Sequence, residues 1–139
     1  MKKLMSVTLT GFCLLLMASI AHTSDLFSED AVATARHFAQ IIDNGNYADA
    51  YSQASPILRL AQTQQEFVTS VERERQLLGP VQQRHLKALR AIGIYPRFPD
   101  GDYLIVQFEA RTMHKEKAAE VILLRHQNGV WLVADYSIR

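Results

Sequence analysis

The first half of the chain carries apolar residues at helical spacing. From Ser28 onward they recur every three or four positions until the pair Asn44-Gly45, which is typical of a helix stop. Ser28 is the predicted N-cap, because a serine side chain can accept a hydrogen bond from a free backbone N–H of the first turn. The pattern therefore predicts one amphipathic helix between these points.

A second, shorter helix is predicted over residues 47–54, before Pro56 interrupts the pattern. Tyr47 and Tyr51 lie four positions apart and so share one face of this helix. Such a pair can line a ligand pocket, although packing of a short helix against a sheet is its more common use. We keep both tyrosines as candidate ligand-binding residues.

A third helix is predicted to begin at Thr63, which forms a capping box with Glu66, and to end at Gly79-Pro80. The alternating charges of residues 72–75 lie on this helix. A run of mixed charges at this density is typical of a solvated helix face, so we expect these side chains to be exposed.

Beyond Pro80 the helical period gives way to strands, which are predicted over residues 82–95, 103–112, 118–127 and 130–138. Asn128-Gly129 separates the last two strands and is the preferred pair for a type I′ hairpin, since both positions need a positive φ. This turn places Gln127 opposite Val130, so the register of the hairpin follows by counting outward.

A turn over residues 114–117 would pair Arg111 with Glu120 and Ala110 with Val121. One face of the sheet would then be covered by helices and would carry Leu104, Val106, Phe108, Ala110, Val121, Leu123, Leu132, Ala134, Tyr136 and Ile138. The outward face would carry Ile105, Glu109, Arg111, Glu120, Ile122, Leu124, His126, Trp131, Val133 and Asp135. These elements predict an α+β domain in which three N-terminal helices pack on a curved four-stranded antiparallel sheet.

The predicted outward face holds more apolar surface than a monomer usually leaves in water. Its candidate interface residues are Ile122, Leu124, Trp131 and Val133. A two-fold axis would set this patch against itself, so we expect a weak homodimer or a protein partner docked there. Trp131 is the expected anchor, because large aromatic residues dominate interface energies.

The chain begins with a pattern typical of a secretory signal peptide. Lys2 and Lys3 precede a short apolar run that ends in small residues at Ala21. The run is too short, and too closely followed by polar residues, to favour a membrane span. We therefore expect a signal peptide over residues 1–21, a single domain over residues 22–139, and a periplasmic or secreted protein with no membrane anchor after cleavage.

Charge and cysteine content exclude several functions. The chain has 15 Lys+Arg and 14 Asp+Glu, and loss of the two signal lysines leaves the expected mature protein nearly neutral, which argues against nucleic acid as a partner. The single cysteine, Cys13, lies in the predicted signal, so the mature chain has no disulfide or thiolate chemistry. The five histidines lack the paired spacing of metal ligands. We expect no metal and no cofactor.

Several turn and core motifs together resemble a known family. They are Gly45-Asn46-Tyr47, Ala54-Ser55-Pro56, Pro99-Asp100-Gly101, Ala119-Glu120, and Gly129 with Trp131. In these motifs the chain resembles the exported bacterial family called domain of unknown function 4019 (DUF4019), and its order of elements is similar to the nuclear-transport-factor-2-like, or cystatin-like, fold. The resemblance implies that fold and an exported location, with no reaction attached.

These features are consistent with a binding domain, with an enzyme, and with an envelope stress or immunity-like role through protein contact. The first hypothesis is a non-enzymatic exported domain that binds a protein partner or a small apolar ligand. The alternative is a small-molecule enzyme of the isomerase, dehydratase or hydrolase type, with the apolar cone-shaped pocket that the fold implies. The predicted register counts against proton transfer, because it puts no carboxylate or histidine of the last three strands beside Tyr136. The candidate ligand-binding residues are Tyr47, Tyr51, His85 and Tyr136.

Overall fold

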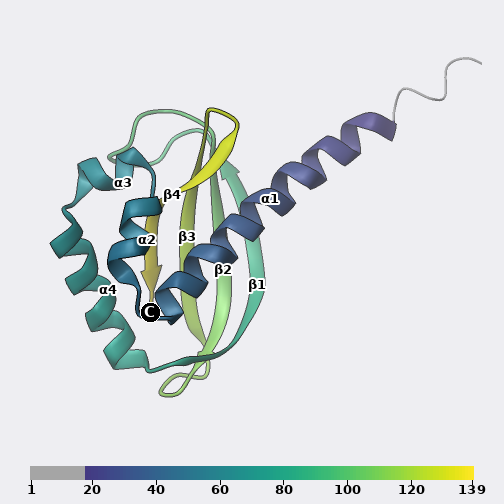
Figure 1. The fold of residues 1–139 in the computed structure, drawn as a ribbon. Coiled ribbons are helices and arrows are strands. Elements are labelled where there is room, and N and C mark those ends of the chain that lie inside the picture. The colour runs from purple at the N-terminus through teal and green to yellow at the C-terminus, as the bar shows by residue number, and fades with distance from the viewer. Residues whose placement is uncertain (1–17) are drawn as a thin grey trace, which may run out of the picture.

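The computed structural model describes the backbone of residues 18–139 and the side chains of residues 27–139. Figure 1 shows an open antiparallel sheet with helices on one face. Its four strands lie side by side in chain order: β1 (Val81–Ile92), β2 (Tyr103–Thr112), β3 (Ala118–Gln127) and β4 (Val130–Ile138). The α+β class and the single four-stranded antiparallel sheet are confirmed. Residues 1–17, which form most of the predicted signal peptide, lie outside the described residues.

The helices that precede the sheet are α1 (Ala18–Asp43), α2 (Tyr47–Gln53), α3 (Pro56–Ala61) and α4 (Gln64–Leu78). α2 and α4 occupy the positions predicted for the second and third helices, and α4 starts with the predicted capping box. α3 was not predicted. The predicted number of helices, three, is therefore one fewer than the described residues contain. Ser55 caps α3, and Pro56 at its first position has a φ already suited to a helix.

α1 begins ahead of its predicted N-cap, at Ala18 rather than at Ser28. Residues 18–27 contain no glycine or proline, so no residue type that breaks a helix stands before Ser28. The prediction of Ser28 as an N-cap is therefore wrong. Figure 1 shows the first turns of α1 projecting past the edge of the sheet, while its later turns lie across the sheet.

The hairpin between β3 and β4 has the predicted turn. Asn128 and Gly129 have φ of 53° and 80°, and Gln127 lies opposite Val130. Positive φ at both central positions matches the right-handed twist of the flanking strands. The Asn-Gly prediction and the register nearest the turn are confirmed.

Replacing Gly129 with alanine should destabilise the domain by on the order of 1 kcal/mol, because a side chain disfavours positive φ. A Cβ at Gly129 would meet nothing within 4 Å, so the cost is conformational rather than steric. Gly93→Ala is the matched control, since only the Gly101 carbonyl oxygen lies near, at 4.0 Å. Urea unfolding midpoints measure both variants, and equal midpoints would contradict this account of the turn.

The predicted register between β2 and β3 is wrong. Ala110 lies opposite Ala118, which is three residues from its predicted partner Val121. Because side chains alternate along a strand, an odd shift turns all of β3 over. The turn between β2 and β3 also differs from the predicted turn over residues 114–117. It is closed by a hydrogen bond in which the backbone N–H of Thr112 donates to the carbonyl oxygen of Lys115 at 2.8 Å.

The four residues predicted to form an outward interface therefore lie in the core. Ile122, Leu124, Trp131 and Val133 are all buried, and they pack with Phe38, Ile42 and Phe67 of the helices. A register shift in the β3–β4 ladder near Leu124 then keeps Tyr136 and Ile138 on the helix side, as predicted. The exposed apolar patch on which the predicted homodimer rested is not present at these positions.

The opposite face of the sheet is partly covered by the segment that follows β1. Tyr95 and Phe98 of this segment pack against a small second core of Tyr103, Leu123 and Ala134. The Tyr103 hydroxyl donates to the Pro99 carbonyl oxygen at 2.6 Å and holds the segment down. β3 thus buries side chains on both of its faces.

Candidate functional site

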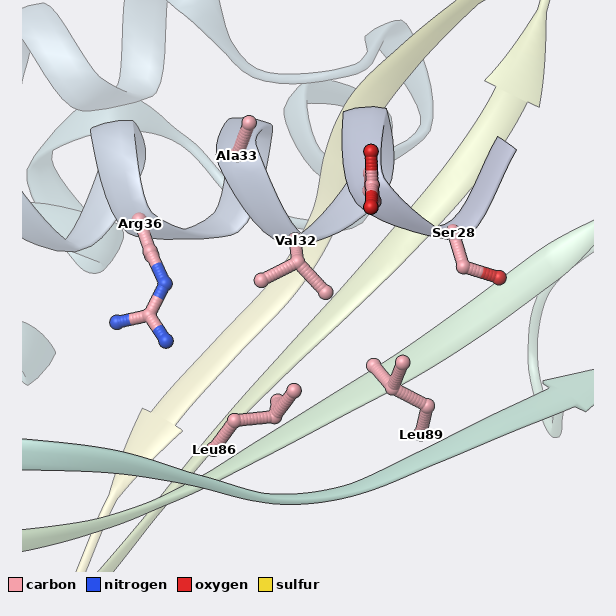
Figure 2. Close-up of a pocket in the computed structure, with 7 residues that line it drawn as sticks. Ser28, Val32, Ala33, Arg36, Leu86 and Leu89 are labelled. Atoms are coloured by element: carbon pink, nitrogen blue, oxygen red, sulfur yellow. The ribbon is translucent and has the colours of Figure 1, made fainter. Parts of the chain in front are cut away.

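A groove of about 360 Å³ lies between α1 and β1 on the helix side of the sheet (Figure 2). α1 contributes Ser28, Val32 and Arg36, whose side chains point toward β1 because residues four apart share one helix face. β1 contributes Leu86 and Leu89, whose side chains point back toward α1. α1 itself packs on β2, β3 and β4, so this stretch of β1 stays open to solvent.

A β-bulge allows both leucines to face the groove. Residues three apart on a regular strand point to opposite faces. The β1–β2 register shifts at Lys87, so Leu86 lies opposite Phe108 and Leu89 lies opposite Val106, two inward-facing core residues. Each leucine keeps 40% of its surface exposed. The sequence predicted a strand here but not the bulge, and hence not the groove.

A second cleft of about 460 Å³ adjoins the groove at Ser28 and extends toward the β3–β4 hairpin. Phe27, Ile92 and Trp131 are among its lining residues. The Trp131 ring lies 4.6 Å from that of Phe27, and its Nε1–H donates to the Phe27 carbonyl oxygen at 3.2 Å. The two hollows together give an apolar path from Arg36 to Trp131.

A cluster of charged side chains lies at the end of α1, and two of its members, Arg75 and Glu120, are buried. Glu120 has no exposed surface; it accepts hydrogen bonds from the Arg84 guanidinium and, at 3.0 Å, from the Tyr136 hydroxyl. Arg84 also donates to both carboxylate oxygens of Asp43, at 2.9 and 3.0 Å. Arg75 donates to Asp43 at 2.9 Å. The two positive and two negative charges therefore balance within the cluster.

Two members of this cluster lie where the sequence did not predict them. Glu120 was predicted on the outward face opposite Arg111, and the inversion of β3 brings it into the core instead. Arg75 belongs to the charge run that was predicted to be solvated, yet it is buried. The helix-covered face thus does hold a carboxylate beside Tyr136. The alternation of apolar and polar residues could not have revealed the inward position of Glu120, because residues 121–124 are all apolar.

The surroundings of the cluster favour the charged form of Arg84 and the neutral form of Tyr136. Burial disfavours the charge on Arg84, but its hydrogen bonds to Asp43 and Glu120 raise its pKa above the ordinary value. Burial raises the pKa of Tyr136 well above its usual range, and the charge of Glu120 raises it further. The Glu120 carboxylate has no exposed surface and already accepts hydrogen bonds from a guanidinium and a phenol, so a substrate in solution does not reach it.

Residues 34–136 match the family described as protein of unknown function (DUF4019). The chain belongs to this family. The DUF4019 segment covers β1, β2, β3 and β4 as far as Tyr136, together with the charged cluster and the groove residues Arg36, Leu86 and Leu89. Ser28 and Val32 precede it, so part of the α1 wall of the groove lies outside the matched segment. Curated proteins give no match.

The structure of this DUF4019 protein does not bring the four predicted ligand-binding residues together. The Tyr51 hydroxyl donates to a backbone carbonyl oxygen at the end of α3, at 2.8 Å, and Tyr47 packs half-buried against the core. Tyr136 belongs to the buried cluster, whereas His85 is exposed on the outer face of β1. None of the four lines the groove of Figure 2. Their ligand-binding role stays a prediction.

The outer face of the DUF4019 sheet has a cleft of a different kind. Tyr95, Arg97 and Asp135 are among the residues lining this hollow of about 320 Å³. Burial raises the pKa of Asp135, while a hydrogen bond to the Tyr136 backbone N–H opposes the rise. Polar groups dominate its walls, so it suits an apolar ligand less well than the groove does.

Among the residues with described side chains, no three His, Cys, Asp or Glu residues gather as metal ligands. Within residues 18–139, no helix is both long enough and apolar enough to cross a membrane.

Proposed function

We propose that this DUF4019 protein is a non-enzymatic domain that binds a small apolar ligand in the groove between α1 and β1. The half-exposure of Leu86 and Leu89 carries the proposal. Taking a leucine side chain from fully exposed to fully buried contributes roughly 1.5–3 kcal/mol, so covering the exposed 40% of each leucine would contribute about 0.6–1.2 kcal/mol. Two such side chains left open beside Val32 favour a ligand that covers them. The volume of about 360 Å³ falls within the range of small-molecule sites.

We also propose that the domain is of the nuclear-transport-factor-2-like, or cystatin-like, type and that it is exported. Helices followed by a four-stranded antiparallel meander, with the helices on one face, support the fold. The basic start and short apolar run of residues 1–21 support cleavage near Ala21 and a periplasmic or secreted location.

The alternative functions have less support. An enzyme would need a reachable base, and Glu120, the carboxylate beside Tyr136, is fully buried and bound to Arg84. A protein partner docked on Trp131 would need that side chain at the surface, and only 7% of it is exposed.

Titration with 1-octanol, 1-decanol and 1-dodecanol tests the groove. Trp131 is the sole tryptophan and lines the adjoining cleft, so its fluorescence should report binding. Each buried CH₂ contributes about 0.8 kcal/mol, so affinity should rise by about fourfold for each carbon until the groove is filled. A Trp131 signal that does not saturate with any of the three alcohols would refute the proposed function.

Matched variants locate the binding. Leu86→Gln and Leu89→Gln should each weaken decanol binding by about fivefold or more, because a polar group replaces apolar wall. Leu77→Gln on α4 is the control, since Leu77 is 73% exposed and lies away from the groove. Equal affinities for all three variants would place the alcohol elsewhere.

A further inference from the structure

We propose that the groove selects a fatty carboxylate, whose head group pairs with Arg36 and whose chain extends toward Trp131. This inference rests on the proposed function and adds the chemical class of the ligand. Three observations carry it: a positioned cation at one end of the groove, the lack of an acidic partner for that cation, and an acidic residue at the other end.

Arg36 is held in place by an aromatic ring rather than by an acid. Its side chain points into the groove (Figure 2), and its guanidinium carbon lies 5.1 Å from the centre of the Phe108 ring. Such a contact orients a guanidinium while leaving its charge and its edge donors available. A carboxylate fits this group because two parallel N–H donors match its two oxygens.

No carboxylate of the described residues pairs with Arg36. Residues 32–40, one helical turn to either side, contain no Asp or Glu. Arg75 of α4 and Arg84 of β1, by contrast, are bound by Asp43 and Glu120. Arg36 is therefore the cation at this groove that can bind an anion from solution.

The opposite end of the α1 wall sets the direction of the ligand. Glu29 lies seven residues before Arg36 and also lines the groove, which places it about 10 Å away along the helix axis. Its charge would repel a carboxylate at that end. The apolar chain then runs past Val32 and Leu89 into the cleft that contains Trp131.

The test compares decanoate, 1-decanol and decyltrimethylammonium, which share one chain and differ in head-group charge. We expect decanoate to bind about tenfold more tightly than decanol, and decyltrimethylammonium more weakly than decanol. Arg36→Gln should remove the preference for decanoate, so that the ratio of the decanol and decanoate dissociation constants falls from about ten to about one. Arg111→Gln is the matched control, because Arg111 is an exposed arginine of β2 outside the groove.

The outcomes separate this inference from the proposed function. Equal binding of decanoate and decanol, or a preference that survives Arg36→Gln, overturns the fatty-carboxylate inference and leaves an apolar groove. No binding of any of the three overturns both. Sedimentation with phosphatidylglycerol vesicles, without binding of free decanoate, would assign Arg36 to a membrane surface and overturn the inference as well.

Discussion

Replacing Glu120 with leucine is expected to lower the free energy of unfolding by about 3 kcal/mol. The substitution leaves two arginines and one aspartate in the charged cluster, so the largely buried Arg75 and Arg84 must share the single carboxylate of Asp43 and one positive charge is in excess. It also removes the acceptor of the Tyr136 hydroxyl. Small domains are stable by only about 5–15 kcal/mol, so the loss should be plain in urea unfolding followed by circular dichroism.

The matched control for this effect is the double variant Glu120→Leu with Arg84→Met. It removes one charge of each sign and leaves Asp43 paired with Arg75. Replacing a buried ion pair with apolar side chains of similar volume is often neutral or stabilising, so the double variant should regain most of the lost stability. If it is no more stable than Glu120→Leu alone, the cost of that substitution does not come from the excess positive charge that Arg84 leaves in the cluster.

Replacing Trp131 with glutamate is expected to unfold the domain rather than to separate a dimer. The substitution removes the ring that packs on Phe27 and puts a carboxylate into the core below α1. Truncating a buried tryptophan alone typically costs about 3–5 kcal/mol, and an unpaired charge adds to that cost. The far-ultraviolet circular dichroism should lose its helical signal at temperatures where the parent protein is folded.

Trp131→Phe is the matched control, since it keeps an aromatic ring and loses only the indole N–H that bonds to Phe27. It should remain folded, at a cost of about 1–2 kcal/mol. A folded, monodisperse Trp131→Glu protein in light scattering would instead support the outward placement that the sequence predicted.

Local chemistry made several elements predictable from the sequence. The Asn128-Gly129 pair determines its hairpin because few other residues accept positive φ at two successive positions. The capping box of Thr63 and Glu66 determines the start of α4, since its two hydrogen bonds form within one turn. Neither feature depends on what the rest of the chain does.

Features that depend on distant packing were not predictable in the same way. The register of β3 against β2 rests on a turn without an Asn-Gly pair, and an error of three residues there inverted the strand. Alternation could not correct the error, because the segment ending in Phe98 covers the outer face and both faces of β3 are apolar. The groove depends on a bulge at Lys87, for which the strand pattern gives no signal.

That bulge also bears on how the molecule avoids aggregation. β1 is an edge strand of an open sheet, and a long, flat edge strand is a template on which a second chain can add a strand. The shift at Lys87 breaks the even row of backbone donors and acceptors that such addition needs. β1 also carries Arg84, His85, Lys87 and Arg90 and no acidic residue, so two such edges laid together would bring like charges into contact. The bulge that opens the groove thus also disfavours the addition of a second chain to the β1 edge of the sheet and the fibril-like stacking that would follow.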